Sequence, residues 1–140
     1  MAAGAVRVIF NSQFSTALFT PPAGSIVSGV TNFNGDDAIV LRDPSMLPKL
    51  SQGVTTVITG NCGLSLVPLV SDAPGSPLDL LHTSEFRFAH LNDYAQAIAD
   101  KPPAVNVGAL IGHTTLRAKV MRDLARAATP EETQAMAVLL

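Results

Sequence analysis

The stretch Gly53-Val54-Thr55-Thr56-Val57-Ile58-Thr59-Gly60-Asn61-Cys62-Gly63-Leu64-Ser65 decides how this chain folds. Its first half is rich in β-branched residues, which is typical of a buried β-strand. Its second half is a turn bracketed by glycines, and it holds the only cysteine of the chain. Functional side chains of α/β enzymes follow the carboxyl ends of strands, so Cys62 is a candidate site residue. The alternative interpretation is a small buried thiol without a function.

Outward from this stretch, helical and strand patterns alternate along the chain. A second strand is expected over residues 104–111, and it ends in Gly112-His113. Alternation of this kind favours an α/β fold of parallel βα units with the two strands as neighbours. Short strands are also expected at residues 6–10 and 26–31. Capping and breaking signals place the helices at residues 46–50, 91–101, 113–124 and 129–140.

Neighbouring parallel strands would bring Cys62 and His113 to one rim, because such strands lie about 4.8 Å apart. His113 is therefore a candidate metal ligand, general base or substrate contact, and the alternative is a partly buried histidine bonded to backbone. Asp36 and Asp37 are interpreted as turn formers, or alternatively as groups that steer a metal or act as acid and base. Arg117 is a candidate partner for a substrate carboxylate, with a solvated side chain or a structural pairing as the alternative.

The composition excludes several classes of protein. The chain has 140 residues, 47% of them hydrophobic and 14% charged, so we expect a globular domain too short for a complete (β/α)₈ barrel. A net charge of −2 gives no support to binding of nucleic acid or of anionic membranes. One cysteine excludes an internal disulfide. Neither a membrane-length apolar run nor a signal peptide is evident, so a cytoplasmic location is expected.

Several blocks of sequence, taken in order, resemble the N-acyl-D-amino-acid deacylases of the metal-dependent amidohydrolase superfamily. The most specific is Gly60-Asn61-Cys62-Gly63-Leu64-Ser65-Leu66-Val67-Pro68-Leu69. The others are residues 36–44, 49–57, 104–117 and 128–132. The resemblance covers residues 36–140, whereas residues 1–35 form a divergent N-terminal segment for which short strands are expected.

This resemblance implies a zinc-bearing (β/α)₈ barrel with a small β domain, of which residues 36–140 would form part. It implies hydrolysis of an N-acyl-D-amino acid to a carboxylate and a free D-amino acid. It also implies that Cys62 is a metal ligand, which suits zinc because a coordinating metal deprotonates a thiol. The implied partner is the small-molecule substrate, not nucleic acid or a membrane.

The sequence also departs from the family pattern. The family has a His-x-His pair directly before its Asp-Asp, but here Phe33-Asn34-Gly35 precedes Asp36-Asp37. Two further histidine ligands and a catalytic aspartate of the family would lie beyond Leu140. We therefore expect either an incomplete enzyme, inactive alone, or a binding or subunit module that reuses barrel elements. Unpaired sheet edges predict self-association or a second chain in both cases. A third hypothesis is an amidase with Cys62 as nucleophile and His113 as base.

Overall fold

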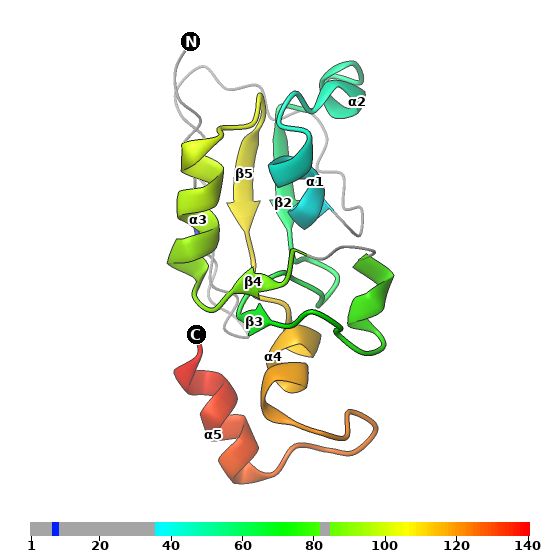
Figure 1. Ribbon diagram of the computed structural model, residues 1–140, viewed down its shortest axis with the longest axis vertical. Helices are drawn as coiled ribbons and strands as arrows, with labels where there is room; N and C mark the ends of the chain where they lie inside the picture. Colours follow the sequence, from blue (N-terminus) through cyan, green and yellow to red (C-terminus); the bar gives the residue numbers. More distant parts are fainter. Residues whose placement is uncertain (1–6, 9–35, 82–84) are drawn as a thin grey trace.

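The structure, a computed structural model, describes residues 7–8, 36–81 and 85–140. Its centre is a three-stranded parallel sheet in the order β1-β5-β2, formed by β1 (Arg7–Val8), β5 (Asn106–Ala109) and β2 (Thr56–Thr59). Strands β2 and β5 pair in register from Thr56 opposite Asn106 to Thr59 opposite Ala109 (Figure 1). The predicted α/β class and the predicted parallel pairing of these two strands are confirmed.

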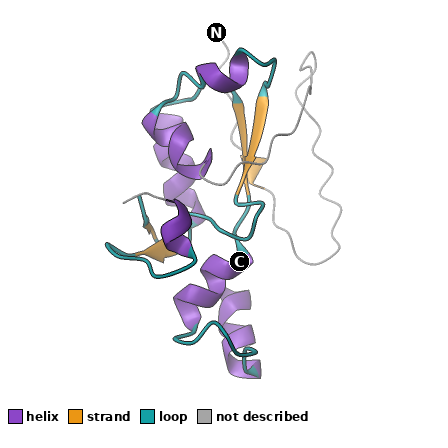
Figure 2. Cartoon of the chain, turned by 90° about the vertical axis from the view of Figure 1, so that its right-hand side faces the viewer, coloured by secondary structure: helices purple, strands orange, loops and turns teal. Residues whose placement is uncertain are grey.

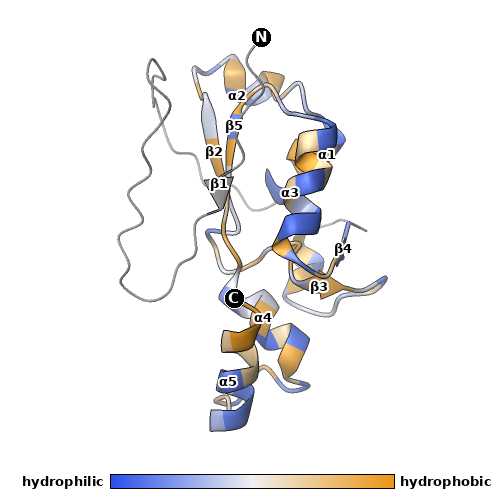
Figure 3. Cartoon of the chain, turned by 90° about the vertical axis from the view of Figure 1, so that its left-hand side faces the viewer, coloured by the Kyte–Doolittle hydropathy of each residue, from blue (hydrophilic) through white to orange (hydrophobic). Residues whose placement is uncertain are grey.

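Helices α1 (Asp36–Arg42) and α3 (Leu91–Asp100) lie on the same face of the sheet (Figure 2). Figure 3 shows the arrangement from the opposite side, with hydrophobic residues along β5. Helix α3 lies where the sequence places it, but α1 was not expected. Its two aspartates in the first turn and Arg42 in the last turn complement the helix dipole. The turn predicted at Asp36-Asp37 is therefore wrong.

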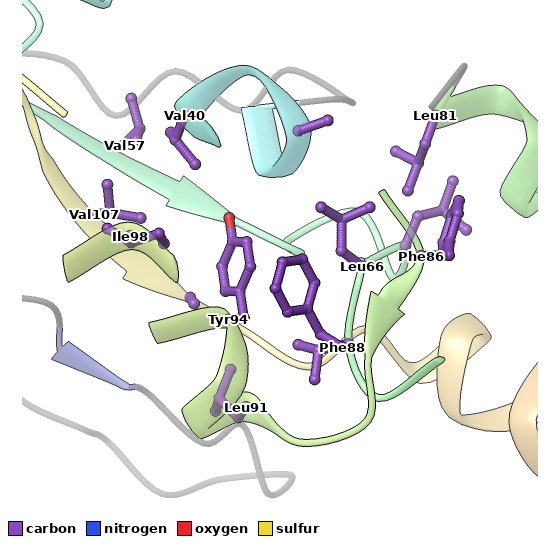
Figure 4. Packing of buried hydrophobic residues seen from close by; sticks show 14 of the residues in the cluster. Val40, Val57, Leu66, Leu81, Phe86, Phe88, Leu91, Tyr94, Ile98 and Val107 are labelled. Atoms are coloured by element: carbon purple, nitrogen blue, oxygen red, sulfur yellow. The ribbon is translucent and has the colours of Figure 1, made fainter. Parts of the chain in front are cut away.

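The core lies between this helical layer and the sheet. Val57 of β2 and Val107 of β5 are buried in one cluster with Val40 of α1 and Ile98 of α3 (Figure 4). Alternate residues of a strand point to the same face, so the β-branched run in β2 supplies both backbone pairing and packing. The core extends past the strand ends, where Phe88, Tyr94, Leu66 and Phe86 are buried.

Tyr94 closes the carboxyl end of this core. Its ring meets Phe88 edge to face, with centroids 5.3 Å apart and an interplanar angle of 73°. Its hydroxyl donates a hydrogen bond of 2.9 Å to the backbone oxygen of Asp37. Burial, and next the nearby charge of Asp37, raise the pKa of Tyr94, so its hydroxyl stays a donor at neutral pH.

The connections on either side of β2 differ in how far the sequence predicts them. The predicted helix before β2 is present as α2 (Leu47–Leu50), and Gly53 follows it with a φ of 79°, as expected of a helix stop. The segment after β2, expected as a long loop, contains the antiparallel pair β3 (Leu69–Val70) and β4 (Arg87–Phe88) and a short 3₁₀ helix, η1 (Leu78–Leu81).

The last two helices, α4 (His113–Val120) and α5 (Pro130–Val138), lie beyond the carboxyl end of the sheet (Figure 1). The prediction of one helix over 113–124 is wrong in its final turn. Arg117 instead donates to the backbone oxygens of Leu124, at 2.9 Å, and Arg126, at 2.6 Å, which satisfies carbonyls of a non-helical segment. The predicted capping box of α5 is confirmed, although the helix ends at Val138 rather than Leu140.

Two of the predictions fall on residues for which the structure says little. The strand expected at 26–31 lies outside the described residues, and of the strand expected at 6–10 only β1 is described. Among the described residues, no helix has the length and apolar character needed to cross a membrane.

Candidate functional site

The carboxyl ends of β2 and β5 bring two loops together. Leu110, just after β5, donates a backbone hydrogen bond of 3.0 Å to Thr59, the last residue of β2. Gly60 follows with a φ of 74°, and a Cβ at this position would overlap the carbonyl oxygen of Leu110. Only glycine fits both constraints, because other L-residues rarely adopt this φ and carry a Cβ. The chain thus turns directly into the loop of residues 60–65, which we call the Cys62 loop.

Both predicted site residues lie at this end of the sheet. Cys62 is exposed in its loop, and His113 is exposed as the first residue of α4. Neither side chain makes a hydrogen bond to any residue that the structure describes, and so not to each other. The buried inert thiol and the partly buried histidine, offered as alternatives, are both wrong. The segments that follow β2 and β5 instead place an exposed thiol and an exposed imidazole, two possible metal-ligating groups, at the same end of the sheet.

The Cys62 loop binds the first turn of α4 through backbone groups. The carbonyl oxygen of Gly63 accepts hydrogen bonds from the backbone nitrogens of Thr114, at 2.9 Å, and Thr115, at 3.3 Å. A helix leaves its first N–H groups without intrahelical acceptors, and Gly63 satisfies two of them here. A Cβ on Gly112 would overlap the same carbonyl oxygen, so Gly112 permits the close approach.

A buried pair of hydroxyls completes the attachment. Thr115 Oγ1 accepts a hydrogen bond of 2.9 Å from the backbone nitrogen of Ser65 and donates one of 3.0 Å to its carbonyl oxygen. Ser65 Oγ accepts from the backbone nitrogen of Gly112 at 2.9 Å and donates to the Val67 oxygen at 2.6 Å. Both side chains are fully buried, so these bonds are shielded from water.

Helix α1 supports the Cys62 loop from the other side. The carboxylate of Asp37 accepts a hydrogen bond of 3.2 Å from the backbone nitrogen of Gly60. Burial raises the pKa of Asp37 to about 6, against the opposing effect of backbone donors that include Gly60 and Leu66. Asp37 is therefore a buried support for the loop rather than an exposed catalytic group.

Asp36 is also buried and has a cationic partner. Its Oδ2 lies 3.0 Å from Nζ of Lys49, while Oδ1 is buried without a hydrogen-bond partner among the described residues. A buried carboxylate is tolerated when it is paired, so the Lys49 ammonium stabilises the start of α1. This pairing and the Arg117 contacts described above give these residues structural roles.

A zinc ion in a protein normally has four ligands, of which the protein supplies at least three. In residues 36–81 and 85–140, no three histidine, cysteine, aspartate or glutamate side chains gather closely enough to hold a metal ion. The described residues therefore do not fit a complete zinc site. A cavity of about 550 Å³ lies elsewhere, between the segment 69–78 and the segment 118–124, and neither Cys62 nor His113 lines it.

The residues that sequence reasoning missed are the buried polar ones: Ser65, Thr115 and, in its supporting role, Asp37. A serine after a glycine turn and a threonine early in a helix have no local pattern that marks them as partners. Their bonds join positions 50 residues apart, so only the folded chain reveals them.

Comparison with known proteins shows that the chain is similar in sequence to one segment of enzymes that deacylate N-acyl-D-amino acids. The chain is 57% identical over 106 residues to an N-acyl-D-aspartate deacylase of Alcaligenes xylosoxydans xylosoxydans, and the match covers 75% of this chain and 21% of that protein. It is 55% identical over 102 residues to a D-aminoacylase of the same organism, covering 72% of this chain and 21% of the relative. The chain thus spans about a fifth of the length of these relatives. No family model matches the chain.

Solved structures give the same result. A crystal structure of D-aminoacylase superposes with a TM-score of 0.73 at 52% identity, covering 79% of this chain and 23% of that one. An N-acyl-D-glutamate deacylase from Bordetella bronchiseptica superposes with a TM-score of 0.66 at 32% identity, covering 99% of this chain and 24% of that one. That deacylase is complexed with zinc and a phosphonate inhibitor, a mimic of the tetrahedral intermediate of the reaction.

Proposed function

We infer that this chain is part of a zinc-dependent hydrolase, because it is homologous to one segment of the D-aminoacylase and N-acyl-D-amino-acid deacylase family. The reaction proposed for the complete enzyme is hydrolysis of the amide bond of an N-acyl-D-amino acid. Water is consumed, and a carboxylate and a free D-amino acid are released. The fold proposed for the complete enzyme is a (β/α)₈ barrel, of which β2, β5 and their helices would be neighbouring units.

The observation that carries this proposal is the position of Cys62. Its thiol is exposed at the carboxyl end of β2, in a loop that both α1 and α4 hold in place. A thiolate is a good zinc ligand, and an accessible thiol on a fixed loop suits that role. We propose Cys62 as one metal ligand and His113, the first residue of α4, as a second candidate. The remaining ligands would come from outside the described residues.

The boundary at residue 36 belongs to the same proposal. We propose residues 1–35 as a divergent N-terminal segment and residues 36–140 as the barrel segment. Support comes from the match of 106 residues to the N-acyl-D-aspartate deacylase, which is close to the length of residues 36–140.

Zinc content tests the proposal directly. The wild-type chain, Cys62→Ala, His113→Ala and the control His90→Ala are dialysed against excess zinc and then against buffer. His90 is an exposed histidine at the start of α3, so it controls for loss of an imidazole elsewhere. We expect bound zinc well below one ion per chain, reduced further in Cys62→Ala, with no hydrolysis of N-acetyl-D-aspartate or N-acetyl-D-glutamate.

Two other outcomes would change the proposal in different ways. Equimolar zinc that is lost in Cys62→Ala would support Cys62 as a zinc ligand. It would contradict the expectation that the chain is inactive without a partner, since the chain would then complete its own zinc site. Zinc retained equally in every variant would remove Cys62 from the site altogether.

The edge of the described sheet supports a second candidate, a binding or subunit module without activity of its own. Strand β2 is the last strand in the described order β1-β5-β2. A strand at a sheet edge favours pairing with a second copy or another chain. Light scattering during size-exclusion chromatography tests this candidate. A dimer or larger species without zinc or activity would favour it, and a monodisperse monomer would contradict it.

A further inference from the structure

The Cys62 loop and the start of α4 are joined by bonds that fix positions without touching either exposed site residue. Thr115 Oγ1 engages both backbone groups of Ser65, at 2.9 Å and 3.0 Å. A single hydroxyl that both accepts from and donates to one residue restrains that residue in two directions. Ser65 lies three positions after Cys62, so this restraint acts on the carboxyl end of the loop.

The same network determines where His113 lies. Gly112, directly before His113, donates its backbone N–H to Ser65 Oγ at 2.9 Å. Thr114, directly after His113, donates its backbone N–H to the carbonyl oxygen of Gly63 at 2.9 Å. His113 thus lies between two residues that both bind the Cys62 loop. The position of this loop, and with it that of Cys62, therefore constrains the position of His113.

The opposite end of the loop is restrained independently. Gly60 donates to the Asp37 carboxylate at 3.2 Å, and its φ of 74° allows the close approach to Leu110. Only the carboxyl end of the loop depends on side chains of α4. Loss of the Thr115 hydroxyl would leave the backbone N–H of Ser65 buried and unpaired, which disfavours the observed loop position.

We propose that Thr115 is a positioning residue, which acts through Ser65 to fix the Cys62 thiol relative to the His113 imidazole. This inference rests on the proposed function only where it treats the thiol as a metal ligand. The restraint itself needs no metal, so it can be measured on the metal-free chain.

The experiment exploits the single cysteine of the chain. A nitroxide is attached to Cys62, and the paramagnetic broadening of the His113 ring protons is recorded by NMR. Amide hydrogen exchange is measured in parallel on the unlabelled chain. The variants are Thr115→Val, which removes the hydroxyl at similar volume, and Thr115→Ser, which retains it. Thr56→Val is the matched control, because Thr56 is a buried threonine whose hydroxyl has no partner among the described residues.

In Thr115→Val we expect the Ser65 amide to exchange about tenfold faster, since one buried hydrogen bond is lost and its donor is left unpaired. We also expect a more mobile nitroxide and a changed broadening of His113. Thr115→Ser should restore both readouts, and Thr56→Val should leave both unchanged. Should Thr115→Val fail to fold, Ser65→Ala, which removes only the bonds of Ser65 Oγ, should change the broadening of His113.

The proposal is overturned when Thr115→Val behaves like Thr56→Val in both readouts. It is equally overturned when amides of α3 accelerate as much as that of Ser65, since Thr115 would then act on global stability alone. Neither readout requires bound zinc. A failed zinc measurement therefore refutes the proposed function, whereas unchanged loop readouts refute the positioning role.

Discussion

The carboxylate of Asp37 accepts a hydrogen bond of 3.2 Å from the backbone nitrogen of Gly60, 23 residues further along the chain. Asp37 is the second residue of α1 and Gly60 directly follows β2, so the bond ties the helical layer to the carboxyl end of the sheet. The Cys62 loop starts at this bond. A buried anion is tolerated there because backbone donors partly replace the water that it has lost.

The raised pKa of Asp37 predicts how stability depends on pH. The native carboxyl group titrates at about 6 and the unfolded one at its ordinary 3.8, so the native state binds the proton more tightly. The free energy of unfolding should therefore fall as pH rises from about 4 to about 6, by up to about 3 kcal/mol. Asp37→Asn should remove this dependence in urea unfolding measured across that range.

The control for this prediction is Asp79→Asn, which neutralises an exposed aspartate of η1. It should keep the pH dependence of the wild-type chain. A slope unchanged in Asp37→Asn would show that another group is responsible.

The ion pair of Asp36 and Lys49 predicts a strong effect of removing one partner. Lys49→Met leaves the fully buried Asp36 carboxylate without its cation and should lower the free energy of unfolding by about 3 kcal/mol. The double variant Asp36→Asn with Lys49→Met should recover much of this loss, as measured by urea unfolding. Lys101→Met, at an exposed lysine, is the control. Equal effects of the two lysine substitutions would contradict the pairing.

Gly60 should not accept a side chain. Gly60→Ala places a Cβ against the Leu110 carbonyl oxygen in a residue with positive φ, and should destabilise the fold by more than about 2 kcal/mol. Gly75 offers the comparison, because a Cβ there would meet nothing within 4 Å. Gly75→Ala should be nearly neutral in thermal unfolding. Similar melting temperatures for the two variants would argue against the close strand-to-loop contact.

The start of α5 predicts a titration that NMR can follow. Hydrogen bonds from Arg126, at 2.7 Å and 2.6 Å, lower the pKa of Glu132 to about 2, and the backbone N–H of Thr129 adds to the effect. Arg126→Gln should raise this pKa towards its ordinary value without reaching it. The contribution of Glu132 to α5 is present above pH 4.5 in the wild-type chain and is lost as the pH falls through about 2.

In Arg126→Gln this loss should begin at a higher pH. Arg122→Gln, at an exposed arginine, should leave the titration of Glu132 unchanged. A shift of the same size in both variants would point to net charge rather than to the paired geometry.

The parts of the site that were predictable are those with a local pattern. The β-branched run before Gly60 identifies β2, and the Asn-Cys-Gly turn after it places the thiol at the strand end. Thr129-Pro130 with Glu132 predicts the start of α5, because capping needs only residues within one helical turn. Helix α1 was not predicted, because Gly35-Asp36-Asp37 is typical of a turn. The burial of Ala38 and Val40 in the core stabilises the helix instead.

Local sequence patterns were enough to predict the α/β class, the pairing of two parallel strands and the placement of Cys62 and His113 at the same end of the sheet. These predictions follow from the periodicity of the strands and from the Gly and Pro residues that end helices and strands, which are local properties of the sequence. The exposure of both side chains and the burial of Asp36 and Asp37 became evident from the folded chain. It alone decided that Ser65 and Thr115 bond across 50 positions. Burial and hydrogen-bond partners depend on which distant segments meet, and that is a property of the packed chain rather than of any stretch within it.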